Sequence, residues 1–508
     1  MQSDMPIIKS NLVAIFIVHF DVIRGNVIEW QYPQEVDLEG IEFQAVCSGL
    51  HRIESDVIVF SRQPQLIGLS VFENRPSEQE RGAQMRAIGV LVKPFDTYDM
   101  IVSEHIPFLK RALDQCMDDQ LNKDDLIRYF TNYVPIPKPT RQPNVTFSID
   151  KSVHHNLREM ISGHSTMSAD IVSSYGMDVF TDFLSQFGPN LFVLWKAALL
   201  KKRILLIHAP PMELACKYVR LIHLLSQVPV AFENKRIRSM KPMFTVGVND
   251  IPLLGKQKDQ GYVACTPDAI FEVKTDLYDL LITLPSSQGH RDRMLNDHPP
   301  IIHSAQHNQA DRIRYQILCQ QPLGQTLQEA RWINQLASYW TGVCYFLYDY
   351  QPSTSSANRD WQQLFAGRQS NRSEEEGLLS FREDEEQDAT EINSASQVFE
   401  AVATTASNEL HQHEVMNYWT LRSLHGLTEC LLTKLKSIIE TRQEGETTIH
   451  LYPKDMVQLG LDPQLDIDFL TELSLLYFNQ PVYIHGLHNS IGHLSDTLCG
   501  CCKQQIRI

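Results

Sequence analysis

Runs of β-branched and aromatic residues recur in the first quarter of the chain and predict strands. Leu12–Phe20 reads LVAIFIVHF and is continuously apolar, as expected for a strand buried on both faces. A Gly25–Asn26 turn follows and predicts a hairpin with the next run. Ile41–Leu50 and Ile101–Met117 have helical spacing instead. The other strands predicted in this segment are 27–31, 56–60, 66–72 and 87–92.

The resulting order, ββ-α-βββ-α, predicts a small, self-contained antiparallel sheet with helices outside it. The first helix is expected to bury one apolar face, formed by Ile41, Phe43, Val46, Cys47 and Leu50. Beyond this module, Pro135–Pro143 reads PIPKPTRQP. Prolines at this density cannot continue a helix or a central strand, so an extended linker is expected.

The middle of the chain alternates between helical and strand-like patterns. Leu191–Leu200 predicts a helix, Arg203–His208 a strand, and Pro210–Pro211 the start of a helix that runs to Leu225. Thr266–Asp268 predicts a further helix start, with proline at its first position. Further short strands are predicted at 229–232, 243–248, 261–265 and 278–284. This alternation predicts an α/β layer with a largely parallel sheet.

The remainder of the chain has mostly helical patterns. Long helical stretches are predicted at 310–348 and 397–442, and shorter helices at 455–459 and 466–478, with a break at 461–463. The stretch 352–395 is polar, acidic and poor in large apolar residues, which predicts a disordered loop inside the helical region.

The predicted fold class is therefore α/β plus α, in three modules, as suits a chain of 508 residues. With their connections, these modules divide the chain into six segments: an upstream sheet lobe, a Pro-rich linker, a central three-layer α/β lobe, a first helical part, the acidic loop and a second helical part. Their expected bounds are 1–134, 135–144, 145–285, 286–351, 352–395 and 396–508.

Charge and cysteine usage narrow the function classes. The net charge is −16, the wrong sign for a general nucleic-acid binder. Half of it lies in 374–391, where nine acids accompany one arginine. The ten cysteines are mostly scattered in apolar surroundings, typical of buried reduced thiols. The N-terminus lacks the apolar core of a secretory signal and no run is long enough to span a bilayer, so a cytoplasmic protein is expected.

The sequence contains no complete motif of the common catalytic classes. Leu254–Gln257 lacks the glycine spacing and hydroxyl of a P-loop. Ser162–Ser165 does not form a nucleophile elbow. His413 and Glu414 begin like a zincin helix, but Asn417 stands where a second histidine is needed. No catalytic residue, cofactor-binding residue or metal ligand is therefore predicted, and no cofactor is expected.

Two further groups have more than one interpretation. Histidines and cysteines near the C-terminus fit either a zinc site or a frayed tail, and palmitoylation of the cysteines is a further hypothesis. These residues are His485, His488, His493, Cys499, Cys501 and Cys502. The basic cluster Lys201–Arg203 favours a structural role at a helix C-terminus. A second cluster could meet anionic lipid or an acidic partner, or be an ordinary exposed loop; it consists of Lys235, Arg236, Arg238 and Lys241. Trp195 and Trp30 are expected to pack in the core rather than stack on a ligand.

Several long stretches resemble one family. Val13–Phe60, from VAIFIVHFDV to ESDVIVF, closely resembles the start of LCHN-type DENN domain proteins. Further matching stretches are ERGAQMRAIGVL (80–91), LWKAALLKKRILLI (194–207), YVACTPDAIFEVKTDLYDL (262–280) and LGLDPQLDIDFL (459–470). The acidic loop and the cysteine-rich tail lie outside the resemblance.

The resemblance implies a tripartite DENN architecture with a longin-like first lobe, a central α/β lobe and a helical downstream part. It also implies a guanine-nucleotide exchange factor for a Rab-type small GTPase in vesicle trafficking, cytoplasmic or peripheral on endomembranes. The GTPase would bind where the first two lobes meet, and anionic membrane is a further expected contact; no individual GTPase-contacting residue can be carried over. The alternative is a non-exchanging adaptor that binds the GTP-loaded form.

Overall fold

The computed structural model describes most of the chain outside the predicted linker and insertion. The described residues are 11–62, 65–77, 82–93, 99–133, 175–233, 237, 240–257, 260–285, 299–303, 305–319, 406–442 and 448–485. The predictions for the linker 135–143, the helix beyond 319, the acidic loop 352–395 and the terminal cysteines fall outside these residues.

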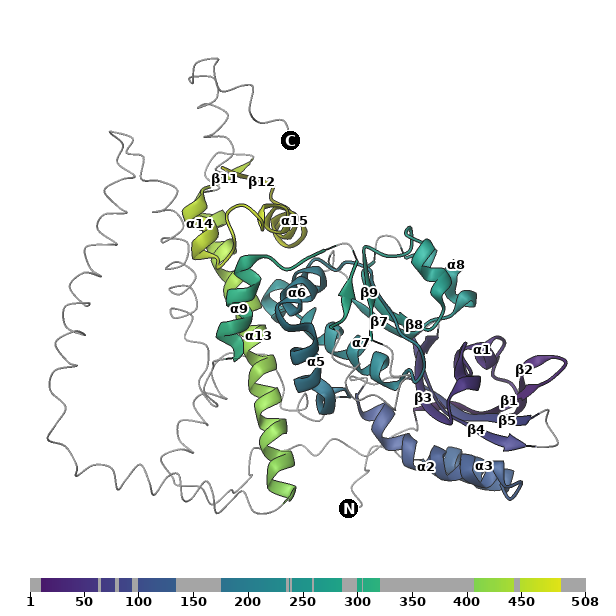
Figure 1. Ribbon diagram of the computed structural model, residues 1–508. Coiled ribbons are helices and arrows are strands. Elements are labelled where there is room, and N and C mark those ends of the chain that lie inside the picture. The colour runs from purple at the N-terminus through teal and green to yellow at the C-terminus, as the bar shows by residue number, and fades with distance from the viewer. Residues whose placement is uncertain are drawn as a thin grey trace, which may run out of the picture.

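A single ten-stranded mixed sheet runs through the described part, in the order β10-β9-β6-β8-β7-β3-β4-β5-β1-β2 (Figure 1). Its strands are β1 Leu12–Asp21, β2 Gly25–Tyr32, β3 Ser55–Arg62, β4 Leu66–Ser77, β5 Gly82–Val92, β6 Ile204–Ile207, β7 Lys241–Thr245, β8 Tyr262–Thr266, β9 Leu280–Thr283 and β10 Ile301–Ile302. Strands β1 to β5 pair antiparallel with one another. Strand β6 pairs parallel with β8 and β9, and β7 pairs parallel with β8. The antiparallel first segment and the largely parallel middle segment are thus confirmed.

Helices cover both faces of this sheet. The first lobe carries α1 Ile41–Ala45, α2 Asp99–Met117 and α3 Lys123–Asn132, with α1 on the opposite side from α2 and α3 (Figure 1). The middle segment carries α5 Phe180–Phe187, α6 Leu191–Leu199, α7 Glu213–Leu225 and α8 Ile251–Gly255.

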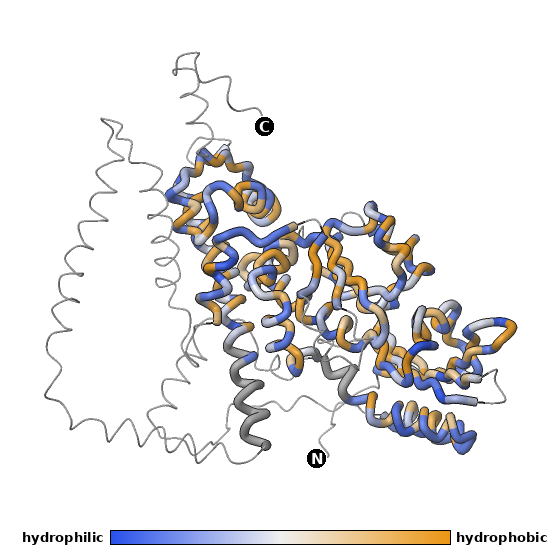
Figure 2. The backbone as a smooth tube through the Cα atoms, in the orientation of Figure 1, coloured by the Kyte–Doolittle hydropathy of each residue, from blue (hydrophilic) through white to orange (hydrophobic). Residues whose placement is uncertain are grey.

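The parallel part of the sheet has a separate core on each face. Along β6, Ile204 and Leu206 belong to the main core with α6 and α7, whereas Leu205 and Ile207 belong to a second core with α8. This alternation follows from the two-residue period of a strand. The central strands are hydrophobic along their length because both faces are covered (Figure 2).

The downstream region is mostly helical within the described residues. It consists of α9 Gln309–Cys319, α13 Ala406–Arg442, α14 Pro453–Gln458, α15 Ile467–Phe478 and a parallel pair of short strands, β11 Ile449–Leu451 and β12 Val482–Ile484. Helix α9 packs against α6, and α13 packs against α7 of the middle segment. None of the helices that the structure describes is both long and apolar enough to cross a bilayer.

Four local predictions were wrong. The expected strand 229–232 is a 3₁₀ turn, Val230–Phe232, closed by the Phe232 N–H to the Pro229 carbonyl at 2.8 Å. The helix start at 266–268 leads into a 3₁₀ helix, Ala269–Val273. The expected helix 41–50 ends at Ala45, and a 3₁₀ turn begins after Gly49, whose φ of +85° interrupts the helix. The first sheet is not self-contained, because β3 pairs with β7 of the middle segment.

Candidate functional site

The residues weighed for catalysis have structural roles in the described part of the chain. Asn417 is buried; it accepts a hydrogen bond from Thr181 Oγ1 at 2.8 Å and donates one to the Met177 carbonyl at 2.9 Å. Of the P-loop candidate 254–257, Leu254 and Gly255 are the last residues of the short helix α8, Ile251–Gly255. Among the described residues, no group of three or more histidines, cysteines or acids could hold a metal ion.

The most distinctive place in the fold is the junction of the two halves of the sheet. There Phe60 of β3 pairs antiparallel with Phe244 of β7, and Ser61 Oγ donates to the Pro242 carbonyl at 3.3 Å. Phe244 has a φ of +56°, in the left-handed region that side chains disfavour, at a register shift between β7 and β8. Gly68 lies opposite Phe60, and a side-chain carbon there would come within 2.0 Å of the Phe60 ring. The sheet thus changes from antiparallel to parallel at a tightly packed, strained point.

Asp56 of β3 fastens helix α7 of the middle segment to the first lobe. Its carboxylate accepts hydrogen bonds from the backbone N–H groups of Met212 at 2.6 Å, Glu213 at 3.2 Å and Val57 at 2.8 Å. The residue is 5% exposed, and burial raises the pKa of its carboxyl to about 6 against the lowering effect of these bonds. A side chain from one lobe therefore satisfies the first N–H groups of a helix in the other.

Gln44 of α1 makes a second contact between the two lobes, beside helix α8. Gln44 Nε2 lies 3.2 Å from Asp250 Oδ1, and Asp250 also accepts from the Gly247 N–H at 2.9 Å. Burial raises the pKa of Asp250, although these two bonds and Arg62 oppose the shift. Arg62 in turn donates to the Glu39 carbonyl at 2.8 Å, which holds the loop before α1.

Exposed apolar side chains flank this Gln44–Asp250 contact. Phe43 is 48% exposed, Val248 50% and Ile270 47%. Phe43 precedes Gln44 and Val248 lies two residues before Asp250, so both apolar residues are close in sequence to the residues that make this contact. Ile270 lies two residues after Asp268. The Asp268 carboxylate is near Gly247, because its Oδ2 would lie 3.8 Å from a side-chain carbon added at that glycine. We call Phe43, Val248 and Ile270 the seam patch.

The sequence pattern assigned Phe43 to a buried helical face, and this was wrong. Helix α1 is a single turn that ends at Ala45, and positions 41 and 43 are about 200° apart on a helix. Ile41 is buried, so Phe43 faces outward. The helical angle between these two positions is the signal that could have identified Phe43 as exposed.

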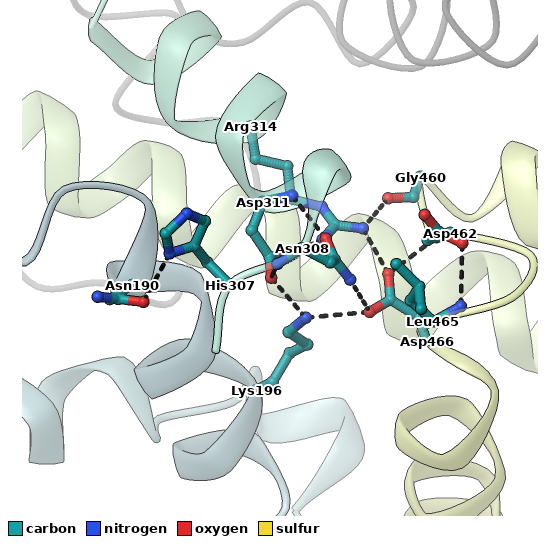
Figure 3. A network of polar contacts seen from close by, with 10 residues as sticks. All are labelled: Asn190, Lys196, His307, Asn308, Asp311, Arg314, Gly460, Asp462, Leu465 and Asp466. Atoms are coloured by element: carbon teal, nitrogen blue, oxygen red, sulfur yellow. Dashed lines mark hydrogen bonds and ion pairs between the residues drawn. The ribbon is translucent and has the colours of Figure 1, made fainter. Parts of the chain in front are cut away.

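A second cluster, of buried charges, holds the downstream helices against the middle segment (Figure 3). Arg314 of α9 pairs with Asp311 at 2.5 Å and with Asp466, at the start of α15, at 3.0 Å. Lys196 of α6 pairs with the same two acids, at 2.9 and 3.0 Å. Burial acts to raise the pKa of Asp466, but Arg314 and Lys196 hold it well below its ordinary value.

We call Lys196, Asp311, Arg314 and Asp466 the charge brace. It contains two cations and two anions, and the side chains of Asp311, Arg314 and Asp466 are at most 1% exposed. Its charges are paired internally and closed off from solvent, so the brace is structural rather than a place for substrate.

The basic cluster Lys201–Arg203 also has the structural role that was favoured. Lys201 Nζ donates to the Ser226 carbonyl, and burial lowers the pKa of this lysine to about 8. Lys202 pairs with Glu472, and Arg203 pairs with Asp279 at 2.7 Å. In the second cluster, Lys241 lies in β7, whereas Lys235, Arg236 and Arg238 fall outside the described residues.

Both tryptophans pack in the core as predicted. Trp195 is 3% exposed, and its Nε1 donates to Thr428 Oγ1 of α13 at 2.9 Å. Trp30 is half-buried against the main core and stacks on Tyr32.

Comparison with known proteins identifies the family. A family model described as DENN domain-containing protein 11 matches residues 15–294, more than half of the chain. The DENN domain-containing protein 11 of Danio rerio is 32% identical over 315 residues, which cover 62% of this chain and 60% of that protein. The Xenopus laevis protein of the same name is 32% identical over 313 residues, covering 61% and 66%.

A yeast protein is also similar. Uncharacterized protein ANR2 of Saccharomyces cerevisiae is 24% identical over 364 residues, covering 63% of this chain and 67% of its own. The matched region spans less than two thirds of the two vertebrate relatives. Strands β2 to β9 and the seam patch lie inside the family match, which begins within β1 and ends before β10. The chain therefore belongs to the DENN domain-containing protein 11 family.

Proposed function

We propose that this chain promotes GDP release from a Rab-type small GTPase, which binds at the seam patch. DENN domain proteins typically act as exchange factors for Rab GTPases, and the chain belongs to a DENN family. The single observation that carries the choice of surface is the exposed Phe43, next to Gln44, which contacts Asp250 of the middle segment. Aromatic side chains, phenylalanine among them, are enriched at the core of protein–protein interfaces.

An exchange factor needs no covalent chemistry. It binds the nucleotide-free GTPase more tightly than the GDP-bound form, and by linkage GDP is then held less tightly. A thousandfold faster release requires about 4 kcal/mol of transition-state stabilisation. Contacts that draw the switch segments of the GTPase away from Mg²⁺ and the phosphates can supply this energy.

The proposed setting is the surface of endomembranes, where the partner would act in vesicle trafficking. The acidic net charge of the chain disfavours nucleic acid as a partner. The adaptor function, in which the chain binds a GTP-loaded GTPase without exchange, is the alternative outcome of the experiment below.

The test is release of fluorescent GDP from a panel of purified Rab GTPases, with the unaltered chain and with Phe43→Ala. The unaltered chain should accelerate release from one member, and Phe43→Ala should reduce that acceleration by about tenfold or more, as loss of a hot spot does. Leu475→Ala is the matched control, because Leu475 is a 56% exposed apolar residue of α15.

The possible results separate the hypotheses. Equal loss in Phe43→Ala and Leu475→Ala would place the GTPase elsewhere. No acceleration across the panel, together with capture of a GTP-locked Rab, would replace exchange by the adaptor function.

A further inference from the structure

The short parallel sheet β11–β12 presents histidine and tyrosine side chains on its outer face. In its register His450 lies opposite Tyr483, between the pairs Ile449–Val482 and Leu451–Ile484. The four aliphatic residues are buried, whereas His450 and Tyr483 are exposed, as the strand period requires. The His485 N–H donates to the Leu451 carbonyl at 2.8 Å and extends the pairing by one residue.

The imidazoles of His450 and His485 meet on this face. His450 Nδ1 lies 2.9 Å from His485 Nε2, and the two ring centroids are 5.1 Å apart. Tyr452 stacks on His485 with an interplanar angle of 8°, and Tyr483 meets the same ring edge-on. Two nitrogen donors from adjacent strands therefore converge, and aromatic neighbours restrict the orientation of one of them.

The spacing suits a shared metal ion. Imidazole nitrogens bind divalent transition metals at about 2.0–2.1 Å, so two of them at a right angle around one ion lie about 2.9 Å apart. The facing nitrogens already lie at this separation, and both lone pairs aim at one point once the rings turn away from the line that joins them. His450 is exposed, so water can reach the remaining coordination positions.

The surrounding charges allow a cation. Arg442 Nη1 donates to the His450 carbonyl at 2.8 Å, but the same guanidinium pairs with both oxygens of Asp455, each at 2.8 Å. Its positive charge is therefore matched, and it holds the backbone of β11 rather than opposing an ion at the rings.

We propose that His450 and His485 form a bidentate site for a divalent transition metal ion, which bridges β11 and β12. Without metal, one ring donates its N–H to the other. With metal, both facing nitrogens act as ligands and the donor's proton moves to its other ring nitrogen. Copper(II) should bind more tightly than nickel(II) or zinc(II).

The test uses the full chain with Cys499, Cys501 and Cys502 replaced by serine, because thiolates would compete for metal. Nickel(II) is titrated by calorimetry. We expect one saturable site that is lost in His450→Ala and in His485→Ala, with no further loss when both are replaced, since the two rings hold one ion. The control is His303→Ala, at an exposed histidine directly after β10, which should keep the site.

A second measurement needs no substitution of either histidine. Bound nickel(II) should protect both His450 and His485 from acylation by diethyl pyrocarbonate, mapped by mass spectrometry, and should leave His303 reactive. The proposal fails if the serine-replaced chain shows no saturable binding, if either single alanine variant keeps the full stoichiometry, or if metal protects neither ring.

Discussion

Asp466 receives four donors, which makes its carboxylate the central member of the charge brace. They are Lys196 Nζ at 3.0 Å, Arg314 Nη2 at 3.0 Å, Asn308 Nδ2 at 3.1 Å and the Asp462 N–H at 2.8 Å. In Asp466→Asn the shape is kept, but one negative charge is lost and an NH₂ group faces donors. Two buried cations are then left with Asp311 alone.

The expected cost follows from the burial of these groups. Breaking a buried ion pair by removing one partner costs about 3–5 kcal/mol, because a charge is left uncompensated. The control is Asp468→Asn, the same change two residues along α15 at an exposed position, where a substitution costs within about 0.5 kcal/mol. The assay is urea-induced unfolding at pH 7, followed by circular dichroism.

The dependence on pH gives a second check. The pKa of Asp466 is lowered in the folded state, so its ionised form contributes stability above the unfolded pKa of about 4 and loses that contribution as the pH falls through the folded value. The difference between the unaltered chain and Asp466→Asn should therefore narrow below about pH 4. A difference between the two asparagine variants of less than about 1 kcal/mol at pH 7 would refute the reasoning.

Two further predictions concern the junction of the lobes. Asp56→Ala removes the cap of α7 and leaves buried N–H groups unpaired, which should lower the free energy of unfolding at pH 7 by about 2–4 kcal/mol in urea titrations; a loss below about 0.5 kcal/mol would contradict this. Burial raises the pKa of Asp56 to about 6, so the protonated carboxyl contributes stability to the fold. This contribution, about 3 kcal/mol, is complete below about pH 4 and is lost as the pH rises through 6. The corresponding pH dependence of the free energy of unfolding should be absent in Asp56→Ala. Gly68→Ala should destabilise by about 1–3 kcal/mol, since its methyl group would overlap the Phe60 ring. Gly255→Ala, with no atom within 4 Å of the new carbon, should leave the melting temperature unchanged or slightly higher; equal losses in the two glycine variants would disprove the packing argument.

Elements with a strong local pattern could be predicted from the sequence. The apolar run at 12–20 forms β1 and the helical run at 191–200 forms α6. Both elements are mostly buried, so most of their positions must be apolar. The strand predicted at 229–232 failed because Phe232 packs edge-on against Phe478 of α15 rather than in the sheet. Its short apolar run is compatible with either environment.

The candidate sites depend on contacts between distant segments. Lys196 and Asp466 are 270 residues apart, and Gln44 and Asp250 are 206 apart. Neither pair has a local signature, because an isolated lysine or glutamine is compatible with an exposed surface. Only the DENN resemblance, which placed the GTPase between the first two lobes, directed attention to the junction before its residues could be named.

The pairing of β3 with β7 has a mechanical consequence. One residue pair, Phe60 with Phe244, joins β3 to β7, so the lobes cannot hinge apart at this point without breaking that pairing. A partner that binds at the seam patch therefore meets a surface whose shape is already set, and little ordering entropy is lost on its side of the complex. If the proposed GTPase binds there, deformation falls on the softer body, the switch loops that hold the nucleotide.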